Sequence, residues 1–298
     1  MNRQAIINLT DDFRNNIYVQ SFNHNMTVVD FEQWGAGEYK IGFDIRKKFG
    51  KFIHLYIPYA SISNLEKAIV FTEFAEKQGV TIVSTLVGYV SYGRQERETT
   101  HEPELLAMTK IMLFQLKNVQ VIEPHTEESM KHFETLSFIQ AMNEQTSSDT
   151  YVIAPDLGAQ SRNSSANVTS HIVANKKRYT TGVATEIVSD KMGLYYPYDP
   201  DTGIALAEEM VKDEPVNFVI YDDICDGGRT FINVAQLVKE QYPKCTITLC
   251  VAHAILPFGT EHLKDHIDKI VTLNTCFPVG TYEDGYIEVL NALDVFYK

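Results

Sequence analysis

The sequence lacks the features that mark several specialised classes of protein. It has no apolar run near the roughly 18 to 20 residues that cross a bilayer, and residues 1–8 lack the apolar core of a secretory signal. No C-x-x-C pair occurs among its four cysteines, which speaks against a zinc site (Cys225, Cys245, Cys250 and Cys276). We therefore expect a cytoplasmic protein with free thiols, no membrane span and no zinc.

A surplus of basic side chains is also missing. The chain has 26 lysines and arginines against 39 aspartates and glutamates, a net charge of −13. Because nonspecific binding to nucleic acids and anionic membranes needs basic surface, this balance disfavours both as partners. A nucleotide ligand is not excluded, since it needs only a local cationic pocket.

Short apolar segments alternate with helical patterns along the chain. This alternation predicts an α/β fold with mainly parallel sheets flanked by helices. The polar stretch 143–149 is the candidate linker, so we expect domains at residues 1–145 and 146–298. The last segment has the option of packing back on the N-terminal domain. Strands are predicted at 52–58, 80–87, 119–123, 151–154, 217–221 and 246–251, and helices at 64–78, from 103 and after 228.

The segment from Val216 to Glu240 carries the most chemistry. An apolar strand ends at Asp222 and Asp223, and Asp226-Gly227-Gly228-Arg229-Thr230 leads into a helix. Glycine lets the backbone approach an anion, and the first N–H groups of a helix attract negative charge. Paired carboxylates beside such a loop can hold ribose hydroxyls directly or through Mg²⁺. The segment therefore predicts a phosphorylated-ribose site, with an ordinary βα turn as the alternative.

This segment resembles the phosphoribosyl-binding loop of type I phosphoribosyltransferases and of ribose-phosphate pyrophosphokinases (PRPP synthetases). A second motif favours the synthetases: Tyr92-Gly93-Arg94-Gln95-Glu96-Arg97 resembles their ATP-binding Tyr-Ala-Arg-Gln-Asp-Arg loop. The resemblance implies that Arg94, Gln95, Glu96 and Arg97 bind ATP. Two arginines beside a carboxylate can grip a triphosphate, although such a run is also typical of a charged surface loop.

Three further segments resemble the synthetases' metal and catalytic elements. Glu123-Pro124-His125 lies where the family has Asp-Leu-His, and Pro155-Asp156-Leu157-Gly158 matches its Pro-Asp-x-Gly turn. Asn175-Lys176-Lys177-Arg178 matches Asp-Lys-Arg-Arg at the base of a catalytic flexible loop. The resemblance implies metal binding by His125 and Asp156, and catalysis by Lys176, Arg178 and His125. A structural histidine, a plain Asp-Gly turn and a basic surface patch are the alternatives.

The matches follow one another in the family's order from about residue 30 to residue 278, most of the chain. The resemblance implies two phosphoribosyltransferase-like domains and transfer of the β,γ-diphosphoryl group of ATP to the C1 hydroxyl of ribose 5-phosphate. It also implies Mg²⁺ as cofactor, ATP as co-substrate and a homo-oligomer, either dimer or hexamer. His253 stands at the place of the family's Thr-His-Pro, where it either lines the ribose-phosphate pocket or is structural.

The sequence departs from the family at the adenine site. The synthetases' Phe-x-Asp-Gly-Glu element contributes to that site from a neighbouring subunit, whereas this chain reads Trp34-Gly35-Ala36-Gly37-Glu38. The aspartate is missing, which puts the adenine contacts of Trp34 and Glu38, or the subunit arrangement behind them, in doubt.

A second departure concerns the acceptor. The synthetases' loop usually reads Asp-Thr-Gly-Gly-Thr, so Gly227 removes a hydroxyl and is expected to leave more space, while Arg229 adds a cation. Backbone amides alone can bind a terminal phosphate, so ribose 5-phosphate remains an acceptor. An acceptor extended beyond that phosphate, such as ADP-ribose, suits the same changes, and phage-type enzymes that pyrophosphorylate ADP-ribose are the resemblance for it.

Two other functions remain open at this point. A phosphoribosyltransferase that consumes PRPP shares the loop, but the Arg94–Arg97 motif and the two-domain length speak against it. A synthetase-like regulatory subunit without catalysis is supported by the altered Trp34–Glu38 element. The retained residues Arg94, His125, Asp156 and Lys176 argue for an enzyme.

Overall fold

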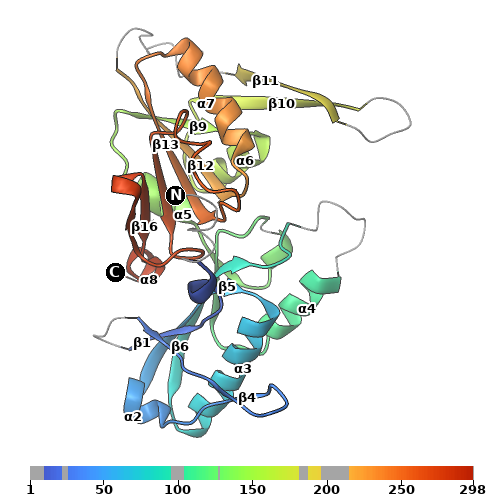
Figure 1. The fold of residues 1–298 in the computed structure, drawn as a ribbon, viewed down its shortest axis with the longest axis vertical. Helices are drawn as coiled ribbons and strands as arrows, with labels where there is room; N and C mark the ends of the chain where they lie inside the picture. The colour runs from blue at the N-terminus through green and yellow to red at the C-terminus, as the bar shows by residue number, and fades with distance from the viewer. Residues whose placement is uncertain are drawn as a thin grey trace. The chain divides into compact units, whose positions relative to one another are not determined.

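The chain folds into two compact units (Figure 1). The computed structural model describes residues 10–21, 26–94, 104–126, 128–180, 187–195 and 215–297, with the backbone alone at residues 104, 175–180 and 187–195. Counting described residues, the N-terminal unit comprises 10–136, 273–278 and 291–297, and the C-terminal unit comprises 137–272 and 279–290. The division after Leu136 comes earlier in the chain than the expected boundary at residue 145.

The N-terminal unit is built on a six-stranded sheet with the order β2-β1-β5-β6-β7-β8. The last four strands of this order are parallel, whereas β1 is antiparallel to both β2 and β5. The strands are β1 (Tyr18–Ser21), β2 (Thr27–Val28), β5 (Phe52–Ala60), β6 (Thr81–Val90), β7 (Val119–Ile122) and β8 (Glu134–Leu136), with a separate hairpin of β3 (Glu32–Gln33) and β4 (Tyr39–Lys40). The helices are α2 (Ile45–Phe49), α3 (Ile62–Lys77), α4 (Glu104–Leu113), α8 (Ala292–Phe296) and the 3-10 turn η2 (Glu128–Met130).

Local sequence signals explain α3. The hydroxyl of Ser61 accepts a hydrogen bond from the backbone N–H of Asn64 at 3.2 Å and so caps the helix. Apolar residues three and four apart, among them Leu65, Ala68 and Phe71, form its buried face. Gly79 follows with a φ of +69°, a conformation that suits glycine and ends the helix.

The end of the chain belongs to the N-terminal unit. The hydroxyl of Tyr56, on β5, donates to the backbone carbonyl of Asn274 at 2.8 Å. The side chain of Asn274 in turn accepts from the backbone N–H of Ala292 at 2.7 Å. Because Tyr56 and Asn274 are buried, these bonds hold two distant stretches of sequence on one core.

The C-terminal unit is built on an eight-stranded sheet with the order β11-β10-β9-β12-β13-β14-β16-β15. The five strands β10, β9, β12, β13 and β14 are parallel, and β10 and β11 form a long antiparallel ribbon (Figure 1). The strands are β9 (Thr150–Ala154), β10 (Ile172–Thr180), β11 (Ile187–Tyr195), β12 (Asn217–Cys225), β13 (Thr246–Ala254), β14 (Lys269–Leu273), β15 (Gly280–Tyr282) and β16 (Ile287–Leu290). The helices are α5 (Phe138–Asn143), α6 (Leu157–Ser165), α7 (Arg229–Gln241) and the 3-10 turn η3 (Glu283–Gly285).

The predicted α/β fold with mainly parallel sheets flanked by helices is confirmed. The central strand β12 is buried along almost its whole length, as a parallel strand covered on both faces must be. Helix α5 contacts β12 and β13, and α6 contacts β9, β10 and β12. The alternative of a plain turn at residues 155–158 does not hold, because Asp156 caps α6, which begins at Leu157.

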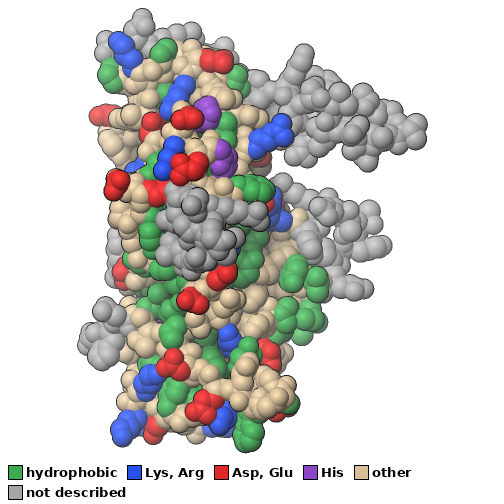
Figure 2. Space-filling view, viewed as in Figure 1, with side chains coloured by type: hydrophobic (Ala, Val, Ile, Leu, Met, Phe, Trp, Pro, Cys, Tyr) green, Lys and Arg blue, Asp and Glu red, His purple; other side chains and the backbone are tan. Residues whose placement is uncertain are grey.

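The cysteines and the charged side chains are the next features of the structure. All four cysteines are free and buried. Among the described residues no helix has both the length and the apolar character needed to cross a membrane. On the face drawn in Figure 2, acidic and basic side chains are interspersed over both units.

The close approach of β5 and β6 gives a test of the N-terminal sheet. A Cβ atom added at Gly88 would lie 2.3 Å from the carbonyl oxygen of Pro58, so Gly88→Ala must push the two strands apart. We expect a loss of about 1–3 kcal/mol in the free energy of unfolding, measured in urea. Gly35→Ala is the matched control, because nothing lies within 4 Å of its Cβ position. Equal effects of the two substitutions would contradict the packing described for β5 and β6.

Candidate functional site

The acidic pair lies inside strand β12, not beyond its end. The strand was expected to stop at Tyr221 but continues to Cys225, with Asp222 in register with Val251 of β13. Asp222 is 7% exposed and Asp223 is 2% exposed. Two carboxylates are therefore held within the sheet, where they need a counter-charge.

Arg162 supplies that counter-charge. Its side chain extends from α6, and the guanidinium forms an ion pair with Asp222 and a second one, at 3.0 Å, with Asp223. The backbone N–H of Asp223 also donates to the Asp222 carboxylate at 2.9 Å. Sequence reasoning missed Arg162, because it lies 60 residues before Asp222 in a stretch for which no helix was predicted.

Burial sets the electrostatics of this cluster. It raises the pKa of Asp222 well above the usual range of a carboxyl, and the charge of Asp223 raises it further, while Arg162 opposes both effects. Burial on its own lowers the pKa of Arg162, but the attraction of the two carboxylates outweighs it and the pKa is raised. Arg162 is therefore a fixed cation, and its charge favours the ionised form of Asp222 against burial and the charge of Asp223.

Asp156 fixes the helix that carries Arg162. Its carboxylate accepts a hydrogen bond from the backbone N–H of Ala159 at 2.8 Å and so caps the N-terminus of α6. Its charge also acts on Arg162 and raises the pKa of that residue. The predicted metal-binding aspartate and the acidic pair therefore belong to one electrostatic cluster within the C-terminal unit.

The loop after β12 has the backbone of an anion site. Gly228 has a φ of +75°, in the left-handed region, and α7 begins at Arg229 without a side-chain cap. A Cβ at Gly228 would lie 2.6 Å from the Leu263 side chain, so the position excludes other residues. The first N–H groups of the 13-residue helix α7 are thus left for another acceptor. Asp226, Gly227 and Thr230 are partly exposed and Arg229 is exposed.

The space expected at Gly227 is not open, which corrects the sequence interpretation. A Cβ added there would lie 3.2 Å and 3.4 Å from two ring atoms of Phe258. The Nε2–H of His262 donates to the Gly227 carbonyl oxygen at 3.0 Å. Residues that follow β13 therefore form a wall beside the loop. Sequence reasoning did not single out Phe258 or His262, since no local pattern marks them.

His253 lies in β13 itself. It is 3% exposed and in register with Ile224 of β12. This places its backbone beside the strand that carries the acidic pair, and both of its expected roles remain predictions.

The predicted ATP-binding residues that the structure describes lie in the N-terminal unit. Arg94 is in the turn that follows β6, and Gln95, Glu96 and Arg97 lie outside the described residues. Trp34 and Glu38 close the β3–β4 hairpin, where the Trp34 N–H donates to the Glu38 carbonyl at 3.0 Å. Trp34 is 61% exposed, and Lys40 Nζ lies 5.0 Å from its ring centroid. The ATP-binding roles of Trp34 and Glu38 remain predictions.

The remaining predicted residues are placed in part. His125 follows β7 in the N-terminal unit and is half-buried, whereas Asp156 belongs to the C-terminal unit. Lys176 and Arg178 lie in β10, opposite Met192 and Asp190 of β11, and their side chains are outside the described part of the chain. In that described part, no group of three histidine, cysteine or acidic side chains is arranged to hold a metal ion.

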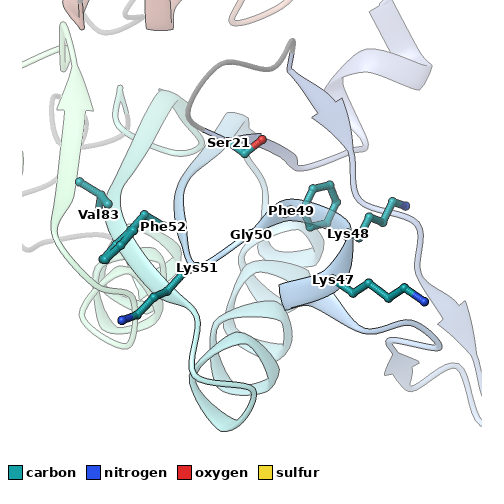
Figure 3. A pocket seen from close by; sticks show the side chains of 8 residues that line it. All are labelled: Ser21, Lys47, Lys48, Phe49, Gly50, Lys51, Phe52 and Val83. Atoms are coloured by element: carbon teal, nitrogen blue, oxygen red, sulfur yellow. The ribbon is translucent and has the colours of Figure 1, made fainter.

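A surface hollow in the N-terminal unit is a separate feature. It has a volume of about 550 Å³ and lies where α2, β5 and β6 meet. Figure 3 shows Lys47 and Lys48 extending to one side of it and Lys51 to the other. Because the ammonium groups do not converge, the hollow lacks the geometry of an anion site, and none of the predicted site residues lines it.

The dependence of the acidic pair on Arg162 can be tested directly. Arg162→Met leaves two buried carboxylates without this cation, and we expect a loss of about 3–5 kcal/mol in the free energy of unfolding at pH 7. Without the cation, the pKa of Asp222 in the folded state rises further above the unfolded value of about 4. The folded variant then binds protons more readily than the unfolded chain, so its deficit should shrink as the pH falls from 7 toward 4.

The control is Arg162→Met combined with Asp222→Asn and Asp223→Asn, which removes the charges together. This triple variant should recover most of the lost stability at pH 7, measured by urea unfolding. A deficit in the single variant that is the same at pH 5 and pH 7 would show that lost packing, not orphaned charge, is responsible.

Two known proteins resemble this chain, one in sequence and one in fold. No protein-family model matches the chain. In sequence it is 22% identical over 244 residues to ribose-phosphate pyrophosphokinase of Mycoplasmopsis pulmonis (strain UAB CTIP), covering 78% of this chain and 70% of the relative. In structure it matches phosphoribosylpyrophosphate synthetase from Mycobacterium smegmatis with a TM-score of 0.58 and 13% identity, over 99% of this chain and 93% of the other. The sequence relative and the shared fold together confirm the predicted resemblance to the ribose-phosphate pyrophosphokinase (PRPP synthetase) family.

Proposed function

We propose that the chain is an ATP-dependent diphosphokinase that transfers the β,γ-diphosphoryl group of ATP to the C1 hydroxyl of a 5-phosphorylated ribose. The observation that carries the proposal is the continuous run from two buried carboxylates on β12 to the uncapped N-terminus of α7. Carboxylates can accept hydrogen bonds from ribose hydroxyls, and a helix N-terminus can bind a phosphate. The carboxylates and the helix N-terminus belong to one βα segment, and we propose that one ribose bearing a 5′-phosphate binds to both.

The acceptor side of the proposed reaction uses the C-terminal unit. Asp222 and Asp223 hold the ribose hydroxyls, and the loop Asp226-Gly227-Gly228-Arg229-Thr230 holds the 5′-phosphate. Arg162 holds the acidic pair in place through its two ion pairs, which makes it a positioning residue. Arg229 is exposed, and its charge is available for a phosphate outside the loop.

The ATP side uses the residues that the family resemblance indicates. Arg94, Gln95, Glu96 and Arg97 bind the triphosphate, with Trp34 and Glu38 near the adenine. Lys176 and Arg178 stabilise charge on the transferring phosphoryl groups. The C1 hydroxyl attacks the β-phosphorus, the bond to the oxygen bridging the α- and β-phosphates breaks, and AMP leaves. The hydroxyl proton passes to solvent, and no covalent intermediate with the protein is needed.

Mg²⁺ fits the donor chemistry of the C-terminal unit. It prefers oxygen ligands and is commonly bound through one or two carboxylates together with waters and substrate phosphates. Asp156 is such a carboxylate: one of its oxygens caps α6, and the group already faces the charge of Arg162. When bound with ATP, Mg²⁺ would neutralise charge on the phosphate oxygens, with Asp156 and His125 as its proposed protein contacts.

The acceptor is proposed to be ribose 5-phosphate or ADP-ribose. The loop has backbone donors for a terminal phosphate, which is all that ribose 5-phosphate requires. The exposed cation at Arg229 offers an interaction to a second phosphate, as in ADP-ribose, and so supports the longer acceptor.

The activity can be tested by incubating the protein with ATP, Mg²⁺ and each acceptor separately, and measuring AMP. We expect AMP formation that depends on acceptor, because only diphosphoryl transfer releases AMP from ATP. Product from ribose 5-phosphate and none from ADP-ribose would remove the extended acceptor. Base-dependent consumption of PRPP without AMP would indicate a phosphoribosyltransferase, and no turnover with either acceptor would favour a regulatory subunit.

The role of Lys176 gives a second test of the proposal. Lys176→Ala removes a cation from the transferring groups, and we expect kcat to fall by about 10²- to 10³-fold with the unfolding midpoint preserved. Lys239→Ala, in the last turn of α7, is the matched control, since that lysine pairs with Asp268 on the surface. Unchanged turnover in Lys176→Ala would count against the assignment of this residue.

A further inference from the structure

Phe258 stands exposed beside the phosphate loop. It follows β13, and 64% of its surface is accessible, although most of its immediate neighbours are buried. Two atoms along one side of its ring, Cδ2 and Cε2, lie 3.4 Å and 3.2 Å from the Cβ position of Gly227. Any side chain larger than glycine at position 227 would therefore press on this ring. The absence of a side chain at Gly227 and the presence of the ring at Phe258 are complementary.

The backbone around Phe258 is firmly held. The N–H of Ile255 donates to the carbonyl of Cys225 at 2.8 Å, and the N–H of Gly259 donates to that of Leu256 at 3.1 Å. The hydroxyl of Thr260 donates to the Glu283 carboxylate at 2.9 Å. Leu256 and Thr260 are fully buried or nearly so. The ring is thus presented on a fixed turn tied to the end of β12.

His262 connects this turn to the loop. Because its Nε2–H donates to the Gly227 carbonyl, the orientation of the peptide between Gly227 and Gly228 is set. In a trans peptide the N–H points opposite to the carbonyl, so the Gly228 N–H is directed away from His262. The turn that carries Phe258 therefore also orients a donor of the phosphate loop, and ring and loop form one rigid unit.

The exposed ring of Phe258 offers an apolar face on which a ligand can pack. Within the described part of the chain, the Phe258 ring stacks on no other aromatic ring and lies near no lysine or arginine cation. Burying its open surface against a planar group would recover the hydrophobic and stacking energy that exposure forfeits. The sugar and phosphate of a ribose 5-phosphate offer no planar group, whereas a nucleobase does.

We propose that Phe258 is a specificity-determining residue that stacks on a planar, nucleobase-like group carried by the acceptor beyond its 5′-phosphate. The inference rests on the proposed function, in that it assigns an acceptor to the same loop. In this arrangement the first phosphate lies in the loop before α7, the second phosphate lies near Arg229, and the base stacks on the ring of Phe258. ADP-ribose is the probe of this chemical class.

The test compares Phe258→Ala with the unmodified protein, using both acceptors. We expect the ratio of kcat/KM for ADP-ribose to kcat/KM for ribose 5-phosphate to fall by about 5- to 150-fold, the range that base–aromatic stacking contributes. Phe258→Trp should keep the ratio, because it preserves a stacking face. Phe52→Ala is the matched control: Phe52 is also an exposed phenylalanine, at 50%, but lies in the N-terminal unit.

Direct binding keeps this inference separate from the proposed reaction. Calorimetric titration with ADP-ribose and with ribose 5-phosphate, without ATP, should show the same selective loss for Phe258→Ala. Selective loss of binding in a protein that forms no AMP would sustain the stacking role and remove the diphosphokinase. Equal loss for both ligands, or none for either, would overturn the stacking role whatever the enzyme activity.

Discussion

The candidate site depends on one guanidinium that stands against two carboxylates within a sheet. Asp222 and Asp223 are almost completely buried, and burial alone drives the pKa of Asp222 upward. A protonated pair could not accept hydrogen bonds from ribose hydroxyls at all of its oxygens. Arg162, itself largely buried, opposes that tendency and holds the pair in a fixed arrangement through ion pairs to both carboxylates.

The ion pairs of Arg162 constrain helix α6, strand β12 and the turn that leads into α7. Helix α6 must hold Arg162 over β12, and Asp156 both caps the helix and adds negative charge near the guanidinium. Strand β12 must run on past Tyr221 so that the acidic pair lies inside the sheet. The chain can then turn at Gly228 and begin α7, whose first N–H groups receive no side-chain cap from that glycine. The rigidity of the carboxylates and the openness of the helix terminus are therefore linked through one short stretch of backbone.

The sequence carried enough information for the regular elements and too little for the pairing that joins them. Strand β5, helix α3 and the β12–α7 segment were predicted because period, caps and glycines are local signals. The antiparallel β1 and the β10–β11 ribbon were not, since they depend on pairing between distant segments. Arg162 was missed because its ion pairs with Asp222 and Asp223 join distant segments. In addition, an N-capping aspartate and one in an isolated turn look alike until the following helix is known.

Gly227 shows how a correct local observation can carry the wrong consequence. Loss of a side chain at position 227 was expected to open the loop. Instead, the ring of Phe258, which comes from another segment, lies close to the position that a Cβ atom would take. The exchange changes the character of the wall from a hydroxyl, which can bind a terminal phosphate, to an aromatic ring, which cannot. A loop altered in this way keeps its backbone donors for phosphate and gains an apolar face beside them. The proposed acceptor with a group beyond its phosphate rests on that combination, because only such an acceptor has a further group to place on the ring.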